Sequence, residues 1–288
     1  MGARPTLDAS RRSLDCIAYQ FPIMTAALGK VFRERQSGGM EPAAFAAFAI
    51  TLADAARTVT LGAADRVAEN KNEDGTYDPV TAADREAERV IRALIEQAFP
   101  DHGISGEEFG VKEGAGRYVW SLDPIDGTRA FICGLPSWTT LIALLDEGRP
   151  VVGLIDVPTL DERYLGYKGA PGLKASDCRT LTDARLATTD VHIFSDAERE
   201  AFDRLRRPAR VTRYGLDAYA YARLAVGSID LVAENSLKPH DYHALIPVVR
   251  AAGGLIGNWR GEDEYREGQV LAAATPELFE AAVRALAA

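Results

Sequence analysis

Apolar residues recur at helical spacing near the start of the chain. Phe45, Phe48 and Leu52 fall on one side of a helix, with small apolar residues between them. This pattern predicts a long amphipathic helix over residues 42–68. A second helix is predicted to reach residue 99, because Thr81 is a typical N-cap and Pro100 follows as a stop signal.

Short apolar runs bounded by turn residues follow, and they are typical of strands. They lie at residues 118–122, 139–145, 151–157 and 164–167. We expect these runs to be neighbours in one sheet. From about residue 184 the pattern alternates, which favours α/β layering. Strands are predicted at 186–189, 211–213, 229–233 and 254–257, and helices at 196–205, 217–226, 241–252 and 276–287.

These patterns predict an α+β N-terminal lobe over residues 40–183 and an α/β C-terminal lobe over residues 184–288, with a cleft between them. The first 39 residues differ in composition, because basic residues outnumber acidic ones there. We interpret residues 1–39 as a dispensable extension, with Met40 as the natural start. No apolar run is long enough to predict a transmembrane segment.

Composition narrows the function. The 288 residues carry a net charge of -9, which argues against nonspecific binding to nucleic acid, because that requires a basic surface. The three cysteines form no C-x-x-C pair, so neither a zinc knuckle nor a disulfide framework is predicted. We expect a cytoplasmic protein that binds neither nucleic acid nor membrane.

The strongest local motif is the segment 120–128, Trp-Ser-Leu-Asp-Pro-Ile-Asp-Gly-Thr, in which a strand ends in Asp123 and Asp126. Two carboxylates at this spacing suit hard divalent cations. Gly127 lets backbone amides approach an anion, and Thr128 opens a helix. The alternative is an Asp-Pro turn followed by an Asp-Gly turn, which occurs in many proteins.

Two further acidic positions flank this motif. Glu107 lies in a Gly-Glu-Glu loop, where it either completes a cation shell or is simply solvated. Asp241 follows Pro239 at the predicted start of a helix, where a metal role and a role in satisfying helix amides are equally plausible. His240 and His243 suggest loop or packing roles, because the neighbouring candidate ligands are oxygens.

Five blocks in this order resemble the inositol monophosphatase superfamily. The blocks are residues 78–84, 106–108 and 123–128, Glu234, and Asp241 with the Ala-Ala-Gly-Gly segment 251–254. The resemblance covers residues 40–288 and is strongest to the bacterial histidinol-phosphate phosphatase branch. It implies a layered αβαβα sandwich, a homodimer and dependence on two or three Mg²⁺ ions.

The resemblance also implies a ligand set. Glu107, Asp123 and the Ile125 carbonyl would hold one Mg²⁺, and Asp123, Asp126 and Asp241 a second. A third ion would use Glu107 through water. Cations in such a site neutralise the phosphate, activate water and stabilise the leaving oxygen.

Further roles follow from the same resemblance. Thr128 would orient the attacking water, with Asp84 and Glu107 as its catalytic partners, while Gly127 and Thr128 amides cradle the phosphate. The alternative for Asp84 is an exposed helix carboxylate. Asp241 would border the substrate as well as the metals.

Substrate recognition is expected from Glu234 and Asp217, because both suit a cationic organic group. The alternative for Asp217 is a helix N-cap. His240 departs from the tryptophan that the family usually has before the aspartate, and Tyr242 and His243 replace small residues, so the pocket shape is expected to differ.

Three functions remain open at this point. The first is a magnesium-dependent phosphatase acting on histidinol phosphate, and the second is an inositol-1-phosphate or broader sugar-phosphate phosphatase. The third is a catalytically inactive, metal-binding regulatory protein. The intact acidic motifs favour a phosphatase of small phosphorylated metabolites.

Overall fold

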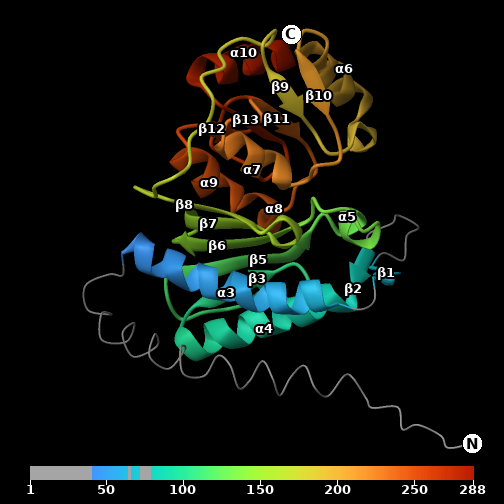
Figure 1. The fold of residues 1–288 in the computed structure, drawn as a ribbon. Helices are drawn as coiled ribbons and strands as arrows, with labels where there is room; N and C mark the ends of the chain where they lie inside the picture. Colours follow the sequence, from blue (N-terminus) through green and yellow to red (C-terminus); the bar gives the residue numbers. More distant parts are fainter. Residues whose placement is uncertain (1–40, 64–65, 72–78) are drawn as a thin grey trace, which may run out of the picture.

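The computed structural model describes residues 41–63, 66–71 and 79–288. The predicted extension over residues 1–39, Met40 and the first residue of the block 78–84 lie outside the described residues. The chain folds into five alternating layers of helices and sheets (Figure 1). This arrangement confirms the predicted αβαβα sandwich.

Two long helices form the outermost layer on the N-terminal side and pack against each other and against the larger sheet (Figure 1). They are α3 (Pro42–Gly62) and α4 (Ala82–Ala98). Within the described residues this sheet has the order β4-β3-β5-β6-β7-β8. Its strands are β3 (Gly103–Gly106), β4 (Gly110–Lys112), β5 (Tyr118–Asp126), β6 (Thr139–Asp146), β7 (Arg149–Val157) and β8 (Glu162–Tyr167). The four predicted strands are confirmed as adjacent, antiparallel neighbours β5 to β8.

The strand β6 is apolar from Leu141 to Leu145. Side chains alternate between the two faces of a strand. Ile142 and Leu144 therefore pack against α3 and α4, whereas Leu141 and Ala143 join the core on the other side. A strand that is covered by helices on both faces needs no polar positions.

The second sheet belongs to the C-terminal half and has the order β10-β9-β11-β13-β12. Its strands are β9 (Arg185–Ala187), β10 (Val211–Arg213), β11 (Leu231–Glu234), β12 (Leu255–Gly257) and β13 (Val270–Ala273). Between the two sheets lie α7 (Tyr219–Ala225), α8 (Pro239–Tyr242) and α9 (Leu245–Ala251). On the outer face lie α6 (Asp196–Arg206) and α10 (Pro276–Ala287), and the remaining short elements are α5 (Thr128–Ile132), η1 (Pro158–Leu160) and η2 (Val191–Ile193).

Two element predictions were wrong in detail. The first helix ends at Gly62, because Ala63 is extended and β1 (Ala68–Asn70) pairs with β2 (Pro79–Thr81). The helix predicted at 241–252 is divided into α8 and α9. The central strand β13 was not predicted, although it pairs with both β11 and β12.

The helix α3 is long and apolar enough to cross a membrane by length and composition, so the expectation that no apolar run is long enough was wrong on that criterion. In the structure, 56% of its most apolar window is buried inside the protein. Its buried phenylalanines Phe45 and Phe48 contact Phe99 and Trp120. These contacts make α3 part of the core.

Candidate active site

The strand β5 carries Asp123 and Asp126 to the edge of the pocket. In a regular strand, residues three apart point to opposite faces. The register with β6 shifts here: Asp123 lies opposite Leu141 and Asp126 opposite Thr139, so three steps along β5 match two steps along β6. One extra residue on β5 therefore forms a bulge, which brings both carboxylates to the same side.

Asp241 completes a cluster with these two aspartates. It lies in α8, and one oxygen of Asp123, of Asp126 and of Asp241 all fall within 4.8 Å of one another. Its Oδ2 also accepts a hydrogen bond of 2.7 Å from the Lys238 amide. Asp241 therefore satisfies a helix amide and joins the acidic cluster at once, so the two readings of this residue are compatible.

The electrostatics of the cluster are those of crowded, buried negative charge. Burial raises the pKa of Asp123 well above its ordinary value, and the charges of Glu107, Asp126 and Asp241 raise it further. Burial and the charges of Asp217 and Asp241 do the same to Asp126. Such a cluster is stabilised when a cation enters it.

Glu107 lies beside Asp123 because β3 and β5 are parallel neighbours. The last pair in their register is Gly106 with Leu122, and the Glu107 amide donates to the Leu122 carbonyl. Lys71 contacts Glu107 at 2.8 Å. Burial acts to raise the pKa of Glu107, but Lys71 outweighs it and holds the pKa below the ordinary value.

The loop that holds Glu107 rests on Glu88, a residue that the sequence reading missed. Glu88 is fully buried in α4 and accepts hydrogen bonds from the amides of Glu108 and Phe109. Arg92 pairs with it at 2.7 Å. A Cβ on Gly106 would lie 2.0 Å from a Glu88 oxygen, so this close approach requires glycine. The signal in the sequence was a glutamate one helical turn after Asp84.

Asp84 is buried rather than exposed, so the alternative of an exposed carboxylate is wrong. Its Oδ2 accepts from the Thr81 amide at 2.8 Å and completes a capping box, which confirms the predicted N-cap. Its Oδ1 has no hydrogen-bond partner among the described residues. Burial raises the pKa of Asp84, and so does the charge of Glu107. One oxygen thus serves the fold, and the catalytic role predicted for Asp84 stays a prediction.

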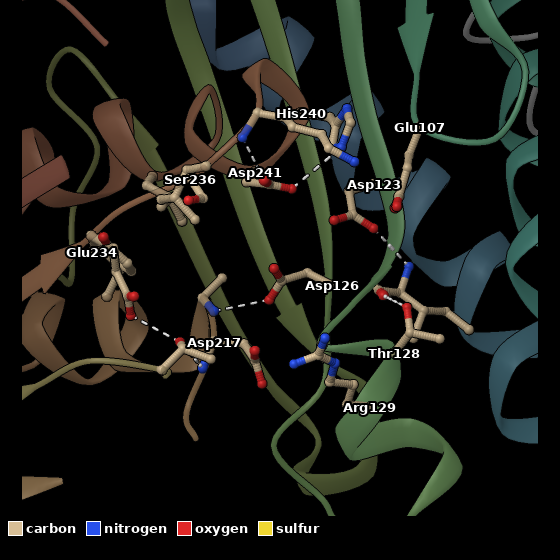
Figure 2. Close-up of a pocket in the computed structure, with 18 of the residues that line it drawn as sticks. Glu107, Asp123, Asp126, Thr128, Arg129, Asp217, Glu234, Ser236, His240 and Asp241 are labelled. Atoms are coloured by element: carbon tan, nitrogen blue, oxygen red, sulfur yellow. Dashed lines mark hydrogen bonds and ion pairs between the residues drawn. The ribbon is translucent and has the colours of Figure 1, made fainter. Parts of the chain in front are cut away.

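Gly127 and Thr128 connect β5 to the short helix α5. Gly127 has φ +80°, and a Cβ there would lie 2.8 Å from Asp217 Oδ2. The Thr128 hydroxyl donates to the Ile125 carbonyl at 3.1 Å. Both residues line the pocket, and Thr128 points into it (Figure 2).

Asp217, which belongs to the C-terminal half of the chain, lies next to Gly127 in the same pocket. It does not cap α7, because the N-cap of that helix is Ala218 and no side-chain cap is present. The capping alternative is therefore wrong. Asp217 has φ +49°, and the Ala218 amide donates to Asp126 at 2.9 Å. Burial raises the pKa of Asp217 to about 6, although Arg129 acts to lower it.

Glu234 ends β11 and is 2% exposed. The hydroxyls of Thr188 and Thr189 donate to its two oxygens. The same Thr189 hydroxyl accepts from the Asp217 amide at 3.1 Å. Burial raises the pKa of Glu234 to about 8. Thr189 therefore links the two candidate recognition residues, a role that the sequence did not indicate.

The two histidines differ in position. His240 lines the pocket, and its Nε2 lies 3.4 Å from Asp241 Oδ1 (Figure 2). His243 bonds to Ser121 on β5 at 3.0 Å, and burial lowers its pKa to about 4. Tyr242 is buried and stacks on Tyr265, so it packs in the core rather than lining the pocket.

Most of the predicted site residues line a pocket of about 530 Å³ to which both halves of the chain contribute, whereas Asp84 is not among the residues that line it. Figure 2 shows Glu107, Asp123, Asp126 and Asp241 close together, with Asp217 beside Asp126 and Glu234 farther from them. Arg129, Ser236 and Tyr221 also line it and were not singled out from the sequence. The oxygen donors and the repulsion among the aspartates fit Mg²⁺, which prefers carboxylate ligands.

A five-layered α/β fold with a carboxylate cluster at a strand end defines a metal-dependent phosphatase. The chain belongs to the inositol monophosphatase family, which it matches over residues 41–288. It is therefore a Mg²⁺-dependent phosphomonoesterase, as the sequence motifs predicted.

Individual relatives agree with this assignment. The chloroplastic bifunctional phosphatase IMPL2 of Arabidopsis thaliana is 46% identical over 205 residues, which cover 68% of this chain and 59% of the plant protein. The chain thus spans under two thirds of that relative. A protein of Streptomyces coelicolor named histidinol-phosphatase is 36% identical over 240 residues, which cover 77% of this chain and 89% of that protein.

A solved structure is similar throughout. It is an inositol monophosphatase from Zymomonas mobilis, with a TM-score of 0.77 and 38% identity, and the match covers 87% of this chain and all of that one.

Proposed function

We propose that this phosphatase hydrolyses histidinol phosphate to histidinol and phosphate. The observation that carries the proposal is the buried carboxylate of Glu234, which faces the acidic cluster across the pocket (Figure 2). Its side-chain hydrogen bonds come from two threonine hydroxyls. Glu234 has no cationic partner among the described residues, and such a buried carboxylate favours a ligand that brings one. Histidinol phosphate carries an ammonium group, whereas inositol phosphate carries only hydroxyls.

Asp217 supports the same assignment. It adds a second half-buried carboxylate on the side of the pocket nearer Glu234, and Thr189 ties its backbone to Glu234. A cation between these groups would lower the pKa of both. The name of the Streptomyces coelicolor relative is consistent with this substrate.

The residues divide the chemistry between them. Glu107, Asp123, Asp126, Asp241 and the Ile125 carbonyl would hold two or three Mg²⁺ ions. Bound there, Mg²⁺ neutralises the phosphate, activates water and stabilises the leaving oxygen. The Thr128 hydroxyl would orient the attacking water, with Asp84 accepting through it. The amides of Gly127 and Thr128 would hold phosphate oxygens.

The test is a phosphate-release panel with Mg²⁺ that compares histidinol phosphate, inositol 1-phosphate and a sugar phosphate. We expect histidinol phosphate to have the highest kcat/KM. The second candidate, an inositol-1-phosphate or sugar-phosphate phosphatase, is supported by the likeness to the Zymomonas mobilis enzyme. Faster turnover of inositol 1-phosphate would establish that candidate instead.

We further propose that the enzyme acts in the cytoplasm as a homodimer, with residues 40–183 and 184–288 as its two lobes. The dimer is expected from the resemblance of the sequence to the family. Sedimentation of the purified chain tests the dimer, because the calculated monomer mass is 31.1 kDa. A sedimentation mass equal to one chain would contradict it.

A further inference from the structure

The hydroxyl of Tyr221 is buried without a hydrogen-bond partner among the described residues. The residue is 1% exposed, yet it lines the pocket that holds the acidic cluster. A buried hydroxyl that has lost its hydrogen bonds to water destabilises the fold unless something replaces them. Phenylalanine would fill the same space without that cost. Packing alone therefore does not account for the hydroxyl.

The charges around this hydroxyl keep it protonated. Burial raises the pKa of Tyr221 well above its ordinary value, and the charges of Glu234, Asp126 and Asp241 raise it further. The charge of Glu234 and the charges of the acidic cluster therefore both raise the pKa of this hydroxyl. It is available as a neutral group that can both donate and accept a hydrogen bond.

The neighbouring carboxylates have other donors. Glu234 receives hydrogen bonds from threonine hydroxyls, as described above. Asp126 Oδ2 receives them from the Thr139 hydroxyl at 3.1 Å and the Ala218 amide at 2.9 Å. The protein has therefore built these contacts without Tyr221, which leaves its hydroxyl for a group that enters the pocket.

The fold places Tyr221 near Asp217 and Glu234, the residues expected to bind the organic group of the substrate. It follows Asp217 by four residues, and its helix α7 packs against β11, the strand that ends in Glu234. An ester whose phosphate lies at the acidic cluster and whose organic group reaches Glu234 must pass this part of the wall.

We propose that the Tyr221 hydroxyl hydrogen-bonds the polar, nitrogen-bearing organic part of the substrate beside Glu234, and so discriminates between phosphate esters. The inference rests on the proposed phosphatase function and adds a specificity-determining residue to it. An amine or imidazole N–H can donate to the hydroxyl, and an imidazole nitrogen can accept from it.

The test compares wild type, Tyr221→Phe and Tyr219→Phe on two esters. One is the ester that ranks first in the phosphate-release panel, and the other is phenyl phosphate, whose organic part has no hydrogen-bonding group. Tyr219 is the matched control, because it lies on the same helix but its hydroxyl donates to Glu162 at 3.2 Å and it does not line the pocket. The readout is the ratio of the two kcat/KM values.

In Tyr221→Phe we expect this ratio to fall about tenfold, mainly through a higher KM for the polar ester. Tyr219→Phe should keep the ratio within about twofold. The melting temperature of ligand-free Tyr221→Phe should equal or exceed that of wild type, because the variant loses an unpartnered buried hydroxyl.

An unchanged ratio in Tyr221→Phe would overturn the inference. Equal losses on both esters with a lower melting temperature would also overturn it and would assign the hydroxyl a structural role. A wrong substrate shows instead in the wild-type ranking of the panel. A wild type that releases phosphate from no ester would overturn the proposed function together with this inference.

Discussion

Single carboxylates in this protein hold a helix end and also belong to, or are predicted for, the site. Asp84 caps α4 through Oδ2 and leaves Oδ1 without a partner in the described structure. Asp241 accepts from a helix amide and still reaches the acidic cluster. Local sequence reading treats such roles as alternatives. The structure shows that one residue fills both, because a carboxylate has two oxygens and several lone pairs.

Asp123→Asn separates the metal role of the cluster from its structural role. We expect Mg²⁺-dependent phosphate release to fall at least about a hundredfold. The melting temperature without Mg²⁺ should rise, because the substitution removes a charge that its neighbours repel. Stabilisation by added Mg²⁺ should decrease. Asp146→Asn is the control, since Asp146 pairs with Arg117 outside the pocket. Full activity in Asp123→Asn would contradict the ligand assignment.

Asp217→Asn tests recognition of a cation. Asparagine tolerates the positive φ at this position, so the backbone is preserved. Breaking a charge-assisted contact costs about 1.5–3 kcal/mol, so we expect KM for histidinol phosphate to rise at least about tenfold. KM for inositol 1-phosphate, which lacks a cation, should change little. Steady-state kinetics on both esters measure this, and an equal rise for both would argue against charge recognition.

At the scale of elements, backbone geometry aims the side chains. The bulge in β5 turns Asp123 and Asp126 to one side, and the parallel pairing of β3 with β5 brings Glu107 alongside. Glu88 supports the loop after β3 by accepting hydrogen bonds from two of its amides. These devices act through hydrogen bonds and register, so their effects are expected on metal affinity and stability.

Gly127→Ala should disrupt the junction between β5 and α5. A left-handed backbone costs an alanine about 1–2 kcal/mol, and here the added Cβ also meets Asp217 at 2.8 Å. Gly148→Ala is a matched control, because Gly148 has φ +79° and no atom within 4 Å of its added Cβ. We expect both variants to lose stability in denaturant titration. Only Gly127→Ala should also lose phosphatase activity, and equal activities would show that the contact with Asp217 is unimportant.

Glu88→Gln should weaken Mg²⁺ binding without abolishing catalysis. The substitution leaves the amides after Glu107 and the Arg92 guanidinium with a poorer acceptor. Groups that support metal ligands typically change metal affinity about 10- to 100-fold, so the half-saturating Mg²⁺ concentration should rise by about tenfold. A Mg²⁺ titration of activity measures it. Glu86→Gln, at a half-buried position of α4 whose side chain pairs with Arg89, should leave that concentration unchanged.

At the scale of the whole molecule, the fold buries acidic side chains whose pKa values are raised by burial. The pKa of Glu234 is raised from 4.5 to about 8 and that of Glu108 from 4.5 to about 7. In both residues burial is the largest cause. Between pH 6.5 and 8 the folded protein therefore holds protons that the unfolded chain has already released.

The consequence is a stability that falls as pH rises. Each such group contributes up to about 1.4 kcal/mol per pH unit. The buried histidines His102 and His243, with pKa values lowered to about 4, act only below about pH 6.5. We expect the melting temperature in a chelator to fall from pH 6.5 to 8. Glu234→Gln should make that slope shallower, and a slope unchanged by the substitution would contradict the raised pKa.

Much of the fold could be predicted because the sequence shows helical and strand periodicities. The Thr81 cap, the strands β5 to β8 and the α/β alternation were all predicted. Other features depend on distant partners. The end of α3 at Gly62 accompanies the pairing of β1 with β2, and the short strand β13 is recognisable only by its neighbours β11 and β12.

The sequence by itself determined the family, the layered fold and the order of the acidic motifs, because those depend on residue types at short spacing. Only the tertiary structure decided how these residues meet. It brought a carboxylate oxygen of Asp241 within 4.8 Å of Asp123 and Asp126, showed that Asp217 does not cap α7, and placed Glu88 where it accepts from the amide of Glu108. The reason is physical: burial, register and charge proximity arise from residues far apart in the chain, and local patterns carry no record of them.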